Sequence, residues 1–142
     1  MATTTISNHF KYQLADKQID LSADTLKAVL LGTSFTFDAD SHATYSDVSA
    51  SELSTGNGYT AGGEALTTLT LAEDDTDNRA EMTCDDVQWD ASGGDIGPFG
   101  AAIIYDDTTS DDTVILCVDF GTDYTIPNGS SFQLKDIEIR VA

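Results

Sequence analysis

The chain has 142 residues, the usual length of one domain with a single hydrophobic core. Its 25 acidic and 6 basic residues give a formal net charge of −19, which disfavours binding to nucleic acid or anionic membranes. Because such a charge also disfavours self-association, any assembly that includes this chain must present neutral or basic contact surfaces.

The first residues of the chain are polar. Residues 1–7 lack the basic and apolar regions of an exported leader, so we expect synthesis and folding in a cytoplasm. No apolar run is long enough to predict a transmembrane span. We interpret 1–8 as an N-terminal arm that becomes ordered on a partner.

The residue pattern of the first half predicts two strands and one short helix. Apolar and polar residues alternate over 10–14, which is typical of a strand with one buried face. The continuous apolar run 26–31 predicts a second, buried strand. The stretch 40–53 is the least strand-like, and a short helix over 50–53, capped by Asp47 or Ser49, is predicted there.

Two acidic turns mark hairpins in the second half. The turn 73–78 separates a segment with leucines at 66, 69 and 71 from the alternating run 79–84, and the turn 106–112 separates two apolar runs. Each pattern predicts a hairpin around its turn. The run 99–105 is expected to form a central strand covered on both faces. In the closing strand, 132–141, a phase slip predicts a bulge near 135–136.

About eight short strands without a long helical pattern favour an all-β protein. We predict a single domain over 1–142, folded as an antiparallel β-sandwich with either a jelly-roll or an immunoglobulin-like connection. Cys84 and Cys117 both lie in apolar runs and are expected to be free thiols.

The sequence offers little chemistry. No GxSxG motif, CxxC pair or phosphate-binding loop is present, and His9 and His42 lie in unrelated segments. With 25 carboxylates, some pair will face each other by chance, so a facing pair does not by itself indicate a glycosidase-like active site. We therefore predict a protein without enzymatic activity or cofactor. Calcium is the main chemical alternative, because aspartates cluster at 38–40, 74–77 and 106–112, although none of these clusters has an EF-hand pattern.

Several segments, taken in order and spacing, carry a resemblance that spans nearly the whole chain. They are 20–27, 45–53 followed by 58–60, 86–89, 104–106, 118–121 and the closing strand after Gly129. Together they resemble a family of small structural proteins encoded among the virion genes of tailed bacteriophages. Cys117 departs from the aromatic or apolar residue expected in its strand, a difference that packing explains.

The resemblance implies a virion component, and the small size and acidity favour a capsid decoration protein on the outer capsid surface. Its expected partner is the major capsid protein, and a homo-trimer or other homo-oligomer is the expected assembly on the capsid. The less acidic first half is expected to face the shell, with both acidic turns facing solvent. The predicted contact residues are Asn8, His9, Phe10, Lys11, Lys17 and Lys27.

Two alternatives belong to other functional classes. A tail or head-fibre module that binds a host glycan would use exposed aromatic residues such as Tyr59, Trp89 or Tyr124. A small carbohydrate-active enzyme would need a pair of facing carboxylates.

Overall fold

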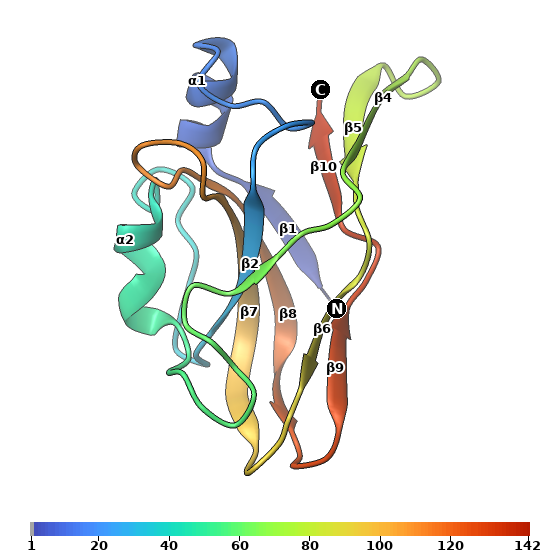
Figure 1. The fold of residues 1–142 in the computed structure, drawn as a ribbon. Coiled ribbons are helices and arrows are strands. Elements are labelled where there is room, and N and C mark those ends of the chain that lie inside the picture. Colours follow the sequence, from blue (N-terminus) through green and yellow to red (C-terminus); the bar gives the residue numbers. More distant parts are fainter. Residues whose placement is uncertain (1) are drawn as a thin grey trace.

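Two layers of antiparallel strands form the body of the protein, seen in a computed structural model that describes residues 2–142 (Figure 1). Strands account for 45% and helices for 11%, so the predicted all-β antiparallel sandwich is confirmed. In chain order the elements are β1 (Thr3–Ile6), α1 (Asn8–Ala15), β2 (Leu26–Leu31), α2 (Tyr45–Val48), a 3-10 turn (Ser49–Ser51), β3 (Glu64–Ala65), β4 (Thr70–Asp74), β5 (Arg79–Thr83), β6 (Val87–Asp90), β7 (Ile96–Asp106), β8 (Val114–Ile126), β9 (Ser131–Leu134) and β10 (Glu138–Val141).

The larger sheet has the strand order β1-β8-β7-β2-β3. The β7–β8 hairpin lies at its centre, with Ile103 opposite Cys117, and β2 pairs with β7 along its whole length. The predicted hairpin around the turn 106–112 and the predicted central strand are therefore confirmed.

The second layer covers one face of this sheet and consists of β10-β5-β4 and the pair β6-β9. The β4–β5 hairpin confirms the one predicted around 73–78. The main core lies between the layers. Its largest fully buried side chains are Trp89, Tyr59, Phe10, Phe99, Leu26, Leu30, Met82, Ile104, Ile115 and Leu116.

The segment 32–63, which contains α2, covers the opposite face of the larger sheet (Figure 1). Phe35, Phe37 and Tyr45 pack there against apolar side chains of β2, β7 and β8. Because both faces of these three strands are buried, their sequences are continuous apolar runs rather than alternating ones.

The Glu52 carboxylate holds this covering segment together. It accepts hydrogen bonds from the Tyr59 hydroxyl (2.7 Å), the Gly62 backbone N–H (2.8 Å) and the Tyr45 hydroxyl. Burial, together with Glu52 itself, raises the pKa of both tyrosines above the ordinary value, so their hydroxyls remain protonated donors.

The strand predicted over 10–14 is wrong, because these residues belong to α1. Phe10 and Leu14 lie one helical turn apart and both contact the core, while Tyr12 is 63% exposed. Residues at positions i and i+4 satisfy the helical period as well as the period of a strand, so five alternating residues fit both structures.

The helix predicted over 50–53 lies earlier in the chain, at Tyr45–Val48, and 49–51 form a single 3-10 turn. Its N-cap is Thr44 rather than Asp47 or Ser49. The Asp47 carboxylate reaches back and accepts a hydrogen bond from the Thr44 N–H (2.9 Å), which satisfies a donor at the helix start.

The phase slip in the last segment is not a bulge within one strand. β9 pairs with β6, whereas β10 pairs with β5, so the chain passes between two sheets at 135–137. Asp136 has a φ of 54° at this crossing. Leu134 ends β9 and Ile137 directly precedes β10, and both are buried because each strand turns one face toward the core.

Cys84 and Cys117 are free, as predicted. Burial raises the pKa of the Cys117 thiol to about 12 and that of Cys84 to about 11, so both thiols are protonated at neutral pH and react slowly. Crossing a bilayer would require a longer and more apolar helix than any in residues 2–142.

Candidate interaction groove

Three neighbouring hollows follow β10 to the end of the chain. The first, of about 420 Å³, lies between β1 and β10. The second, of about 830 Å³, lies between β1, α1 and the end of β10, and the third, of about 410 Å³, between α1 and the β4–β5 hairpin. The first two share Thr4, Ile6 and Arg140, and the last two share Leu14 and Val141. They form one continuous depression, which we call the β1–β10 groove.

The first hollow has an apolar floor. Five of its apolar lining residues belong to the main core or pack against it: Ile6, Leu116, Val118, Leu134 and Ile137. β1 and β10 are the last strands of their sheets, so the sandwich is open between them. The edge of the core therefore reaches the surface at this groove.

Cations without an acidic partner gather along the groove. Of the six basic side chains, all within residues 2–142, Lys27, Arg79 and Arg140 lie within 4.0 Å of a carboxylate oxygen. The other three have no such partner, and each lines one hollow: Lys135 the first, Lys11 the second and Lys17 the third. On a chain with a net charge of −19, these lysines place unpaired positive charge along the groove, beside the lining carboxylates Asp20, Asp136 and Glu138.

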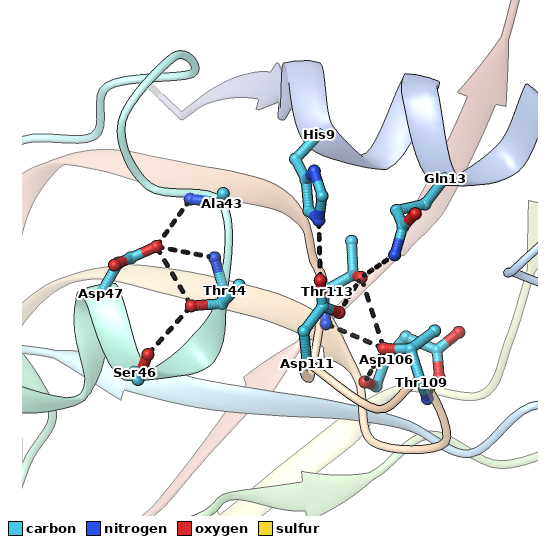
Figure 2. A network of polar contacts seen from close by, with 10 residues as sticks. All are labelled: His9, Gln13, Ala43, Thr44, Ser46, Asp47, Asp106, Thr109, Asp111 and Thr113. Carbon is cyan, nitrogen blue, oxygen red and sulfur yellow. Dashed lines mark hydrogen bonds and ion pairs between the residues drawn. The ribbon is translucent and has the colours of Figure 1, made fainter. Parts of the chain in front are cut away.

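The acidic turn after β7 fixes helix α1, which forms one wall of the groove (Figure 2). Nε2 of His9 lies 2.8 Å from the Asp111 carboxylate, and the Thr113 hydroxyl donates to the same carboxylate (2.6 Å). Burial alone would raise the pKa of Asp111, but the hydrogen bonds from Thr113 and His9 outweigh burial and lower this pKa below its ordinary value. Asp111 is therefore charged at neutral pH and ties the helix to the turn.

Asp106 lies at the base of this turn and is 0% exposed. Its Oδ1 accepts hydrogen bonds from the backbone N–H groups of Thr108 (2.8 Å) and Thr109 (3.3 Å). Its Oδ2 is buried without a hydrogen-bond partner in residues 2–142. Burial, followed by the neighbouring Asp24, raises the pKa of Asp106 to about 7. The turn that supports α1 thus contains a carboxyl group whose charged form is poorly compensated.

Four of the six predicted contact residues line the groove. Asn8, Phe10 and Lys11 line the second hollow and Lys17 the third. Phe10 is only 1% exposed, so it supports the wall from the core side and offers little surface to a partner.

The other two predicted residues, His9 and Lys27, face the acidic turn instead. His9 contacts Asp111, and Nζ of Lys27 lies 3.1 Å from the Asp107 carboxylate. Lys27 therefore pairs with the turn 106–112, which was expected to face solvent, because opposite charges attract. The orientation of Lys11, Lys17 and the acidic turns on a capsid stays a prediction. The turn 73–78 also lies at the same end of the molecule as α1 (Figure 1).

The segment predicted as an N-terminal arm forms the other side of the groove. Met1 lies outside the described residues. Thr3–Ile6 pair with β8 as β1, and Asn8 begins α1, with its N–H donating to the Ala39 carbonyl (3.1 Å). Residues 3–8 are therefore folded onto the sandwich without any partner.

The sequence did not predict the far wall of the groove. Lys135 and Arg140 come from the last ten residues, which are distant in sequence from β1 and α1. The phase slip between Leu134 and Ile137 was the available signal, since it marks the crossing between sheets that leaves the sandwich open here.

The aspartate clusters that resembled calcium ligands bind their own turns. Asp74 and Asp77 lie 3.6 and 3.5 Å from Arg79, and Asp38 accepts a hydrogen bond from the backbone N–H of Asp40 (2.9 Å). Within residues 2–142, no three His, Cys, Asp or Glu side chains form a group that could hold a metal ion.

No protein-family model, curated protein or solved structure matches this chain. The lining of the β1–β10 groove combines an apolar floor with unpaired lysines and the carboxylates of Asp20, Asp136 and Glu138, so it can bind a partner through both apolar and charged groups.

Proposed function

We propose that this chain is a non-enzymatic virion structural protein of a tailed bacteriophage, a capsid decoration protein that binds the outer surface of the capsid through the β1–β10 groove. The observation that carries the proposal is the groove itself, in which an apolar floor lies among three lysines without acidic partners on a chain of net charge −19. The resemblance of the sequence to virion structural proteins supports it from a separate direction.

The proposed role follows from the energetics of many equal contacts. Burial of the apolar floor stabilises a contact by about 25 cal/mol per Å². A contact that bridges two capsid subunits resists their separation, because separation exposes the buried surface again. The capsid lattice repeats the contact at high effective concentration, so individually weak sites act together. We propose a homo-trimer on the capsid as the assembled form, with the remaining acidic surface keeping virions apart.

The tail or head-fibre alternative has less support. Tyr59 and Trp89 are each 1% exposed, and of the three aromatic residues considered for glycan binding only Tyr124, at 43%, reaches the surface. A glycan platform normally requires an aromatic face in contact with solvent, which the first two residues lack.

The copy number in purified virions tests the proposal directly. We expect a copy number of the same order as that of the major capsid protein, because a decoration protein covers the whole lattice. Quantitative mass spectrometry of purified virions, with the major capsid protein as the internal standard, measures this ratio. A handful of copies per particle would reject capsid decoration and favour a tail or vertex location.

Neutralising the three unpaired lysines should weaken capsid binding. We expect the triple variant Lys11→Gln, Lys17→Gln, Lys135→Gln to bind capsids about tenfold more weakly at low salt, since each exposed ion pair contributes up to about 1 kcal/mol. Lys27→Gln is the matched control, because Lys27 is already paired with Asp107 outside the groove. Co-sedimentation with capsids that lack this protein measures both, and equal loss in the control would contradict the assignment of the groove.

A further inference from the structure

The outer edge of β1 has backbone groups without a partner strand. β1 is the last strand of its sheet and pairs only with β8. The Ser7 N–H donates to a carbonyl of β8 (2.9 Å), and in an antiparallel pair the residues that bond the neighbouring strand alternate along the chain. Thr5 and Thr3 therefore also direct their backbone groups to β8, whereas those of Thr4 and Ile6 point away from it.

These outward groups open onto the groove. Thr4 and Ile6 both line its first hollow, and within residues 2–142 no backbone hydrogen bond joins either residue to a segment other than β8. β10, on the other side of this hollow, is likewise the last strand of its own sheet. An unpaired edge beside an apolar floor is the arrangement to which an extended peptide can add as a further strand.

We propose that the major capsid protein adds an extended strand to the free edge of β1, extending the five-stranded sheet by one strand. This inference rests on the proposed function and specifies the form of the partner at the same site. Every second side chain of the added strand would point to the same side of the sheet as Thr4 and Ile6, toward the first hollow, so apolar residues are required there.

The charged side chains of the groove determine which kind of polypeptide can add to the edge of β1. Lys135 and Lys11 lie along the two hollows that β1 borders and have no ion-pair partner. The first hollow also contains Asp136 and Glu138, of which Glu138 pairs with Arg140, so carboxylates of the added segment should lie opposite the two lysines. A second copy of this chain is disfavoured at the edge of β1, because two chains of net charge −19 repel each other in the free protein. In the proposed trimer the capsid lattice, and not this edge, holds the copies together.

Thr4→Pro tests strand addition with little effect on the fold. Proline removes the one N–H at this position, which points away from β8, and an edge strand tolerates proline where the N–H faces outward. Thr4→Val is the matched control, because valine has nearly the same shape and keeps the N–H. We expect Thr4→Pro to bind capsids lacking this protein at least about tenfold more weakly, and Thr4→Val to remain within about twofold of the wild type.

The outcomes separate this inference from the proposed function. If the wild type binds these capsids and Thr4→Pro binds equally well, strand addition is wrong and decoration stands. If the wild type does not bind, both fail. If sedimentation shows that the free protein self-associates and that Thr4→Pro does not, a second copy occupies β1 and the capsid strand is rejected. Should Thr4→Pro fail to fold, amide exchange of the wild-type segment 2–7 decides, since strand addition must slow it on capsids and unchanged exchange overturns the inference.

Discussion

Replacing Asp106 with asparagine is expected to raise the free energy of unfolding by about 1 to 3 kcal/mol at pH 8 and to change it little at pH 4. The folded protein raises the pKa of Asp106 from 3.8 to about 7. The folded state therefore binds this proton more tightly than the unfolded state, and the wild type loses stability as the pH rises from about 4 to about 7. Asparagine is neutral at both pH values and avoids this loss.

Asparagine also fits the hydrogen bonds at position 106. Its carbonyl oxygen can accept from the Thr108 N–H as Oδ1 does now, and its amide group replaces the buried, unpartnered Oδ2 next to Asp24. Asp75→Asn removes the same charge from an exposed turn and should change the free energy of unfolding by less than about 0.5 kcal/mol. Urea unfolding at pH 4 and pH 8 measures the free energy of unfolding of both variants. If Asp106→Asn is no more stable than the wild type at pH 8, the charged form of Asp106 does not destabilise the folded protein and the prediction is wrong.

Truncating Trp89 should have the largest effect on stability, with a loss of about 3 to 5 kcal/mol for Trp89→Ala. Trp89 is 1% exposed in the main core and lies opposite Phe132 in the β6–β9 pair. Its Nε1 has no hydrogen-bond partner in residues 2–142, so Trp89→Phe removes no hydrogen bond and should cost only about 1 to 2 kcal/mol.

Tyr12→Ala serves as the aromatic control, because Tyr12 is 63% exposed, and its loss should change stability by less than about 0.5 kcal/mol. Trp89 is the single tryptophan, so circular dichroism must replace fluorescence as the probe of unfolding. A Trp89→Ala protein as stable as the wild type would place Trp89 outside the core and reopen glycan binding.

The two hairpins were predictable because their signals are local. In each, an acidic turn lies between two strand-like segments: 66–71 and 79–84 around the turn 73–78, and 99–105 and 113–120 around the turn 106–112. The covered faces of β7 and β8 followed from the same runs, because only strands buried on both sides need continuous apolar sequence.

The predictions from sequence were wrong where the secondary structure of a segment depends on residues distant in the chain. β1 reads as a polar arm, and it becomes a strand because β8 offers it a complementary edge. Residues 10–14 fit both periods, and the contact of α1 with the turn 106–113 selects the helix. The groove combines residues 4–17 with 134–142, so the lysines at 11 and 17 were predictable as cations but their neighbour at 135 was not.

Both ends of the described chain border the groove. Ala2 lines its first hollow and Ala142 its second. Any polypeptide joined before Ala2 or after Ala142, such as a purification tag or a displayed antigen, would therefore emerge where the partner is proposed to bind. The loops around Gly93 and Gly129 lie at the other end of the sandwich from α1, with no atom within 4 Å of a Cβ at either position. Their φ values of 85° and 86° favour glycine, so both glycines should be kept. Under the proposed capsid binding, cargo for display belongs in those loops.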